Sequence, residues 1–373
     1  MPAKKPTAES ILRFFALSGK KHLLLTGGRG VGKSTLFAQL LPLLSQSCLL
    51  SDKATSVFPA DIHTRAVPGE GVYLQCVNKV LQIGSFDVSL PGTENKMRPN
   101  RQALEAAAGC LERLALSSKD WIAIDEIGYL ESDCAEYCQA LRQLFHTKHV
   151  LAVLRKQKLP FLEELKSRSD VCVIDLDRPF GKTGCVIMAS GLGKRFHGGN
   201  KLLAMFRGKP LIQWMLDATA NLFEKRVVVT RHPEIVTLCH QQNIPCILHT
   251  LPYRSDTIRL GIEALEQEVD SCVFCPGDQP LLTRETLETM LLSASLFPNH
   301  MLQLSFSDQK GTPVFFPRSL FTELKSLPEG RGGNFLLKKY PEQVRAVPAR
   351  DIYELQDIDT PEDLEAITQR PSP

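Results

Sequence analysis

Short apolar runs alternate with longer amphipathic segments along the whole chain, and this alternation predicts strands that are each followed by a helix. The runs have the length of buried strands, and they are nearly continuous rather than alternating in polarity. Such strands are typical of a parallel sheet whose two faces are covered by helices. In the first half we expect strands at 22–26, 121–125, 150–154 and 171–174, a strand pair within 71–84, and helices at 34–44 and 101–116.

The second half repeats this layout after a polar segment, 177–184, that contains proline and glycine and is predicted to be a linker. The predicted domains are therefore residues 1–178 and 184–373, and the fold class is α/β, with two doubly wound three-layer domains. The halves share a layout but no sequence repeat. In the second half we expect strands at 185–189, 226–230, 245–249 and 271–275, and helices at 210–222, 255–268 and 283–295.

Composition, net charge and cysteine content limit the classes of function that the chain can have. The 373 residues are 43% hydrophobic and 23% charged, so each half can bury a core, and the formal net charge is only +3. No concentrated basic patch indicates a nucleic-acid partner. No apolar run has the length of a membrane span, and the first residues lack an apolar signal core. The 11 cysteines are scattered, with Cys272 and Cys275 expected in the core, which favours a reduced cytoplasmic protein without a membrane partner.

A glycine-rich turn between the first predicted strand and its helix fits the pattern G-x-x-x-x-G-K-[ST], from Gly27 to Ser34. Glycines let the backbone N–H groups face a phosphate chain, and the helix N-terminus adds partial positive charge. Lys33 is expected to reach the terminal phosphates, and Ser34 to offer its hydroxyl to Mg²⁺. The alternative is a glycine turn that only caps the helix. The predicted nucleotide-binding residues are Gly27, Gly28, Gly30, Gly32, Lys33, Ser34 and Thr35.

An acidic pair, Asp125-Glu126, directly follows the apolar run 121–125. A phosphate-binding loop needs acidic partners at the end of a neighbouring strand, so Asp125 is predicted to hold Mg²⁺ and Glu126 to orient the attacking water. The alternative is a pair of solvated acids that open the next helix. The presence of an independent phosphate loop favours the catalytic interpretation.

The run from Ile124 to Glu131, taken with Gly27 to Thr35, resembles the THEP-type (cancer-related) nucleoside-triphosphatases. The resemblance covers about residues 18–178. It implies a P-loop fold, an Mg²⁺ cofactor, and slow hydrolysis of ATP, GTP and other nucleotides with little base selectivity. A second family with some likeness is the P-loop adaptor that accompanies molybdenum cofactor guanylyltransferases, but the Asp-Glu-Ile-Gly stretch favours the first.

A second glycine-rich loop follows the strand 185–189 in the other half and carries basic residues. Gly191 and Gly193 let backbone N–H groups approach phosphate oxygens. Three cations can neutralise a triphosphate and the charge that develops as pyrophosphate leaves. Asp278 follows a predicted strand, at the edge where ligands bind in open α/β sheets, and is a predicted Mg²⁺ ligand, although a turn aspartate is the alternative. The predicted residues of this loop are Gly191, Gly193, Lys194, Arg195 and Lys201.

This half resembles MobA-like nucleotidyltransferases, and within them the molybdenum cofactor cytidylyltransferase branch. The likeness covers about residues 184–368 and rests on Gly191 to Arg195, Asn200 to Leu203, Gly277 to Leu282, Gly311 to Phe316 and Asp357 to Asp363. It implies a Rossmann-like fold, CTP or GTP as substrate, Mg²⁺, and molybdopterin as acceptor.

Three positions depart from the pattern of the resembled branch. Ser190 stands where relatives have alanine or glycine. The segment 253–256 replaces the Gly/Ser-rich turn that binds the base in relatives, which leaves the preference between CTP and GTP open. Gly330 stands where relatives often carry an aspartate, so a second metal ligand would have to be Glu329, Asp359 or water.

The function predicted from the sequence is therefore a bifunctional enzyme. A P-loop domain hydrolyses ATP or GTP with Glu126 as the catalytic residue. A transferase domain moves a nucleotidyl group, CMP from CTP, to molybdopterin through Arg195, Lys201 and Asp278, and a molybdenum hydroxylase is a further expected partner. Alternatives are a different phosphorylated acceptor, such as a sugar phosphate or a phospholactate-like molecule, and a non-catalytic carrier of finished cofactor with an NTPase switch.

Overall fold

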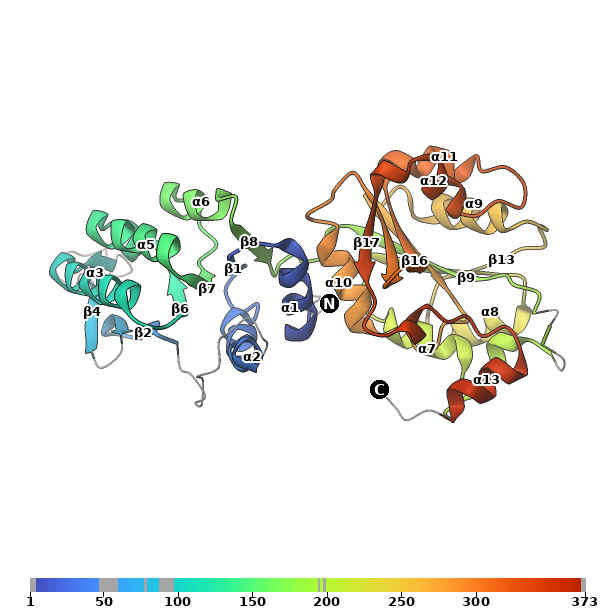
Figure 1. The fold of residues 1–373 in the computed structure, drawn as a ribbon, viewed down its shortest axis with the longest axis horizontal. Helices are drawn as coiled ribbons and strands as arrows, with labels where there is room; N and C mark the ends of the chain where they lie inside the picture. The colour runs from blue at the N-terminus through green and yellow to red at the C-terminus, as the bar shows by residue number, and fades with distance from the viewer. Residues whose placement is uncertain are drawn as a thin grey trace. The chain divides into compact units, whose positions relative to one another are not determined.

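The computed structural model describes residues 5–46, 60–76, 79–86, 97–193, 195–196 and 199–369. The chain divides into two compact units, residues 1–179 and 180–373, and each is an α/β sandwich with helices on both faces of a sheet (Figure 1). The predicted fold class, two doubly wound three-layer domains, is confirmed.

The sheet of the first unit has the strand order β5-β4-β3-β2-β6-β7-β1-β8. Strands from β2 to β8 in this order run parallel, and β3, β4 and β5 extend the sheet by antiparallel pairing. The parallel strands place their carboxyl ends along one edge. The strands are β1 (His22–Thr26), β2 (Ile62–Val67), β3 (Gly71–Cys76), β4 (Lys79–Phe86), β5 (Met97–Pro99), β6 (Trp121–Ile127), β7 (His149–Leu154) and β8 (Val171–Asp175).

Alternate residues of the central strands face the two helical layers, because side chains alternate across a strand. Leu24, Ile122 and Ile124 join one core with residues of α3, α5 and α6. Leu23 and Leu25, equally buried, point to the opposite face, where α2 packs on β1, β6 and β7. The helices are α1 (Ala8–Ser18), α2 (Lys33–Gln46), α3 (Arg101–Leu116), α4 (Tyr129–Ser132), α5 (Ala135–Thr147) and α6 (Pro160–Ser167).

The sheet of the second unit has the order β13-β12-β9-β14-β16-β15-β17, with a separate β10-β11 ribbon. The first four strands are parallel, β16 is antiparallel to β14 and β15, and β17 is parallel to β15. The strands are β9 (Thr183–Ala189), β10 (Met205–Phe206), β11 (Lys209–Pro210), β12 (Lys225–Thr230), β13 (Cys246–Leu248), β14 (Ser271–Pro276), β15 (Met301–Phe306), β16 (Gln309–Pro317) and β17 (Val344–Pro348).

Helices α9, α11 and α12 cover one face of this second sheet, and their apolar side chains share a core with Val186, Phe274 and Phe316 (Figure 1). Helices α7 and α8 lie on the opposite side of the sheet. The helices are α7 (Leu211–Ala218), α8 (Pro233–Gln241), α9 (Arg254–Leu265), α10 (Arg284–Ser293), α11 (Phe321–Lys325), α12 (Asn334–Lys339) and α13 (Pro361–Thr368), and a 3₁₀ turn spans Lys201–Leu203.

Most predicted elements are present, and four predictions need correction. Both sheets are mixed rather than wholly parallel. β6 runs on to Ile127, so the acidic pair lies in the strand instead of after it. α7 ends at Ala218 rather than near residue 222, because Asn221 takes a left-handed backbone (φ 54°) that a helix cannot continue through. β9 begins at Thr183, inside the segment interpreted as linker.

The described cysteines are free thiols, and Cys272 and Cys275 are fully buried in β14. They pack as apolar residues there, as the continuous apolar run indicated. Within the part of the chain that the structure describes, none of the helices is both long and apolar enough to cross a membrane.

Candidate active sites

The phosphate loop of the first unit joins β1 to α2 and has the backbone shape that its glycines allow. Gly30 and Gly32 have left-handed φ angles of 76° and 93°, which residues with a Cβ rarely adopt. Lys33, the first residue of α2, donates hydrogen bonds to the carbonyl oxygens of Gly27 and Gly28, each at 2.9 Å. The Lys33 ammonium is therefore held over the loop, in front of the helix N-terminus.

The acidic pair lies beside this loop, as the strand order β6-β7-β1 requires. The Ser34 hydroxyl donates to Asp125 Oδ1 at 3.3 Å, so the two predicted Mg²⁺ ligands are in contact. The pairing of β6 with β7 is irregular between Asp125 and Ile127, and Glu126 is the residue without a partner. Such a bulge re-aims a side chain next to an active site. Burial raises the pKa of both acids.

A cavity of about 430 Å³ opens at this edge, between the phosphate loop and the strand that carries the acids. Its volume suits a small-molecule ligand. The predicted residues Gly27, Gly28, Lys33 and Glu126 are among those that line it. Thr35, by contrast, is exposed on α2 and does not line the cavity.

Arg155 is a cavity residue that the sequence analysis missed. It follows the last residue of β7, the strand between those that carry the phosphate loop and the acidic pair. Its Nε lies 3.7 Å from Glu126 Oε1, and its guanidinium lies over the Tyr129 ring at 5.5 Å. The only sequence signal was a polar residue directly after an apolar strand.

Asp177 supports the phosphate loop from the end of the first unit and was also missed. Both of its carboxylate oxygens lie 3.0 Å from the Gly28 nitrogen, whose N–H they accept. Lys156 donates to Asp177 at 2.6 Å and to Asp175 at 2.8 Å. The hydrogen bond from Lys156 and that from Gly28 lower the pKa of Asp177.

The glycine loop of the second unit follows β9 and is held by side chains from two neighbouring strand ends. Arg231 Nε donates to the Ser190 carbonyl at 2.9 Å, and His232 Nε2 contacts the Gly191 carbonyl oxygen at 2.8 Å. The Ser190 hydroxyl donates to Val229 O, so it accepts from His249 Nε2 at 2.8 Å. The serine that departs from the family pattern thus anchors the loop.

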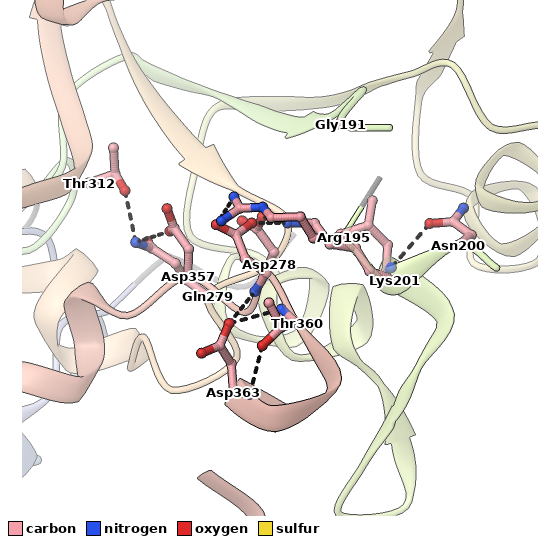
Figure 2. A network of polar contacts seen from close by, with 12 residues as sticks. Gly191, Arg195, Asn200, Lys201, Asp278, Gln279, Thr312, Asp357, Thr360 and Asp363 are labelled. Carbon is pink, nitrogen blue, oxygen red and sulfur yellow. Dashed lines mark hydrogen bonds and ion pairs between the residues drawn. The ribbon is translucent and has the colours of Figure 1, made fainter. Parts of the chain in front are cut away.

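Four charged side chains from distant segments meet beside this loop. Figure 2 labels three of them, Arg195, Lys201 and Asp278. Lys201 Nζ donates to Asp278 Oδ2 at 2.5 Å and to Asp359 Oδ1 at 2.8 Å, and Arg195 donates to Asp359 Oδ2 at 2.6 Å. Burial alone would lower the pKa of Lys201, but the two aspartates outweigh it and the pKa is raised. The hydrogen bond from Lys201 in turn lowers the pKa of Asp359.

Asp357 is a third carboxylate in this centre and was not assigned a role from sequence. Gln279 Nε2 donates to Asp357 Oδ1 at 2.9 Å and to Thr312 Oγ1 at 2.8 Å (Figure 2). Burial, with Asp278 as the next contribution, raises the pKa of Asp357 to about 6. This raised value marks a position where added positive charge would be favourable.

The structure brings Arg195, Lys201 and Asp278 together and sets Gly193 against the Lys201 side chain. Lys194 lies outside the described residues. Of the alternatives for a second carboxylate, Asp359 shares Lys201 with Asp278, whereas Glu329 bonds to Tyr253 instead. No group of three or more His, Cys, Asp or Glu in the described ranges is arranged to hold a metal ion. Mg²⁺ often takes only one or two carboxylates besides substrate phosphates, so two suffice.

These two sites define the class of the protein: one unit has the phosphate loop and acidic pair of a P-loop nucleoside-triphosphatase, and the other the glycine loop and charged centre of a nucleotidyltransferase. An NTPase family model matches residues 76–179, and the MobA-like NTP transferase domain model matches residues 185–344. The chain belongs to the THEP1 nucleoside-triphosphatase family through its first half, and its second half contains a MobA-like NTP transferase domain.

Two proteins and one solved structure are similar to parts of the chain. Nucleoside-triphosphatase THEP1 of Thermotoga petrophila is 30% identical over 159 residues, which is 42% of this chain and 83% of the relative. The mitochondrial 3-deoxy-manno-octulosonate cytidylyltransferase of Arabidopsis thaliana is 25% identical over 162 residues, 38% of this chain and 55% of the relative. The crystal structure of Rv0371c from Mycobacterium tuberculosis has a TM-score of 0.46 at 20% identity, and covers 51% of this chain and 99% of that one.

Proposed function

We propose that the chain hydrolyses nucleoside triphosphates in its first unit and, in its second, transfers CMP from CTP to the terminal phosphate of molybdopterin with release of pyrophosphate. The observation that carries the transferase assignment is the Lys201 ammonium between Asp278 and Asp359, next to the glycine loop. A cation fixed between two carboxylates at the carboxyl edge of a parallel sheet matches the charge pattern of a metal-assisted phosphate reaction.

The donor set of this centre fits Mg²⁺. Asp278 and Asp359 supply hard oxygen ligands that lie close enough to share one ammonium group. Bound there, Mg²⁺ would neutralise phosphate charge and polarise the α-phosphoryl group. Lys201 would then be free to turn from the carboxylates to the phosphate chain, and Arg195 to leave Asp359.

The protein's own part in nucleotidyl transfer is to position charge. Backbone N–H groups at Gly191 and Gly193 approach the triphosphate, and Lys201 and Arg195 stabilise the charge on the departing pyrophosphate. The oxygen of the acceptor phosphate forms a bond to the α-phosphorus, and the bond to the bridging oxygen of pyrophosphate breaks. Arg231, His232 and His249 hold the loop in place through residues 190 and 191.

Hydrolysis in the first unit also depends on positioned charge, here at the phosphate loop. Lys33 transfers its hydrogen bonds from the loop carbonyls to the terminal phosphates of ATP or GTP, and Ser34 and Asp125 fit an Mg²⁺ ion because their oxygens are in contact. Glu126 orients the water. We assign Arg155 to the terminal phosphate, because it lines the same cavity and already pairs with Glu126.

Two observations support CTP as the substrate. The run from Asn200 to Leu203 resembles cytidylyl enzymes more than guanylyl enzymes, which more often have Asp-Lys there. Asn200 also caps the 3₁₀ turn that carries Lys201. A relative named as a cytidylyltransferase aligns with 38% of the chain. The reduced thiols fit the cytoplasm, and a molybdenum hydroxylase that receives the finished cofactor is the partner that this reaction implies.

The test is a pyrophosphate-release assay with ATP, GTP, CTP and UTP, each with and without molybdopterin. We expect release only with molybdopterin and fastest with CTP. Release that is triggered by a sugar phosphate or phospholactate, and not by molybdopterin, would change the acceptor. Tight binding of finished cofactor without pyrophosphate release under any nucleotide would replace the transferase with a carrier.

A further inference from the structure

A cavity of about 140 Å³ lies on the α9 side of the second sheet, next to the transferase centre. It is bounded by β14 and β16, by the start of α9, and by the glycine-rich segment 330–334. This volume is smaller than that of a pocket for a whole cofactor, so it suits one end of a ligand. Its apolar walls include Phe274 and Phe316, which belong to the core of the unit.

Thr312 connects this cavity to the charged centre. The Thr312 side chain lines the cavity and accepts a hydrogen bond from Gln279 at 2.8 Å. Gln279 follows Asp278 in the chain and also donates to Asp357. A molecule that occupies the cavity is therefore linked, through Thr312 and Gln279, to Asp357, the third carboxylate of the charged centre.

Arg254 is the charged side chain among the described residues that line the cavity. It is exposed and is the first residue of α9, where a cation is unfavourable because the helix N-terminus is itself positive. No hydrogen bond or ion pair engages its guanidinium within the described ranges. The nearby carboxylates are occupied: Asp256 accepts the Tyr253 N–H and pairs with Arg259, and Glu329 pairs with the Tyr253 hydroxyl.

In the opposite wall of the cavity, the backbone of the segment 330–334 packs closely against Arg254 and Phe316. A Cβ on Gly332 would lie 3.3 Å from Arg254 Cδ and Nε, and one on Gly333 would lie 2.8 Å from the Phe316 ring. Gly330, with a left-handed φ of 72°, has no atom within 4 Å of where its Cβ would be. Two departures from the resembled branch thus share one cavity: an expected acid is absent at 330, and a cation is present at 254.

We propose that this cavity binds the far end of the acceptor and that Arg254 pairs with an anionic group there, a carboxylate, phosphate or dithiolate, distinct from the phosphate that reacts. The inference rests on the proposed nucleotidyl transfer and adds a substrate requirement to it. Molybdopterin meets this requirement through its dithiolate. A phosphomonoester that also carries a carboxylate meets it as well, whereas a simple sugar phosphate does not.

The test compares Arg254→Gln, Arg254→Lys and Gly330→Asp with wild type in pyrophosphate release from CTP. The acceptors are molybdopterin, 2-phospholactate and glucose 1-phosphate. Arg259→Gln is the matched control, because Arg259 lies on the same helix but pairs with Asp256 and Glu263. Gly330→Asp is tolerated in space, and aspartate is among the residues that enter the left-handed region.

For acceptors with a second anion, we expect Arg254→Gln to raise KM about 10- to 100-fold, with kcat and the KM for CTP unchanged. Arg254→Lys should lose less, and Gly330→Asp should act in the same direction as Arg254→Gln. The KM for glucose 1-phosphate, where it reacts, should stay constant. An equal loss with all acceptors, or no change in any KM, would overturn the assignment.

Failure of the proposed function is recognised separately, by the absence of pyrophosphate release from wild type with every acceptor. Calorimetric binding of 2-phospholactate to wild type and Arg254→Gln then decides the inference. Binding that weakens at least about 10-fold in the variant supports an anion site. Equal binding by the two proteins, or no binding to wild type, contradicts it.

Discussion

The two nucleotide sites of this chain are built in different ways. The P-loop site is formed mostly within one short segment, whose glycines, Lys33 and helix N-terminus lie next to one another in sequence. The transferase site is assembled from side chains that are 77 and 158 residues apart, through Lys201 with Asp278 and with Asp359. The first therefore depends on backbone shape, and the second on long-range charge pairing.

The largest effect is expected at the charge pairing. Asp278→Asn removes one of the two carboxylates that hold Lys201 and fit Mg²⁺, so transferase turnover should fall about 10³-fold while nucleotide hydrolysis by the first unit is unchanged. Pyrophosphate and phosphate release are measured in parallel. Asp308→Asn, at an exposed turn, is the control. Transferase activity within a few-fold of wild type in Asp278→Asn would remove this residue from the centre.

The contacts that assemble the second site should matter for stability as well. Glu354 is 2% exposed and accepts hydrogen bonds from Thr283, Thr286 and the Arg350 N–H, so it ties the segment before Asp357 to the start of α10. Glu354→Ala leaves several buried donors without an acceptor and should destabilise this unit by about 3 kcal/mol.

Urea unfolding followed by Trp214 fluorescence in a Trp121→Phe background reports on the second unit, since Trp214 lies in α7 and Trp121 in β6. Glu365→Ala, near the end of α13, serves as an exposed control. An unchanged unfolding midpoint in Glu354→Ala would show that the network does not hold the segments together.

At the P-loop site we expect a smaller loss of activity from removing Arg155 than from removing Asp278 at the transferase site. Arg155→Gln should lower kcat for ATP hydrolysis about 10²-fold with little change in KM, because the charge on the terminal phosphate grows in the transition state. Binding of ADP with aluminium fluoride should weaken while ATP binding does not. Arg142→Gln, which alters an arginine paired with Glu164 in the same unit, should leave hydrolysis unchanged. A rise in KM alone would assign Arg155 to ground-state binding.

A last expected effect is a pH dependence of the stability of the first unit. Burial lowers the pKa of His22 to about 4, below its ordinary value near 6.5. As pH falls from 6.5 to 4, the unfolded chain takes up a proton that the folded chain does not, so stability is lost in this window, by at most about 3 kcal/mol. Unfolding of wild type and His22→Leu is compared between pH 4 and 7. An equal slope in the two proteins would exclude His22 as the cause.

The contrast between a site within one short segment and a site assembled from distant side chains also explains what could be predicted from the sequence. The P-loop could be predicted because all residues of its motif lie within eight positions, from Gly27 to Ser34, between a strand and a helix. The double-wound layout follows from the apolar runs, and the structure confirms it. Lys201 was predicted as the third cation at the second glycine loop and Asp278 from its place after a strand, and Asp359 was one of three alternatives.

Residues that act across the sheet were not predictable. Arg155 and Asp177 follow strand ends but belong to no local motif, and their meaning depends on the order β6-β7-β1-β8. Asp357 depends on Gln279, 78 residues away. The antiparallel extension of the first sheet was seen only as a strand pair, because pairing partners are set by tertiary contacts rather than by pattern.

The central claim, that one chain holds two independent nucleotide sites with different chemistry, is tested by measuring phosphate and pyrophosphate release in one reaction with ATP, CTP, Mg²⁺ and molybdopterin. Lys33→Ala should abolish phosphate release and keep pyrophosphate release, and Lys201→Met should do the reverse. Loss of both products in each variant, or persistence of pyrophosphate release in Lys201→Met, would contradict the account.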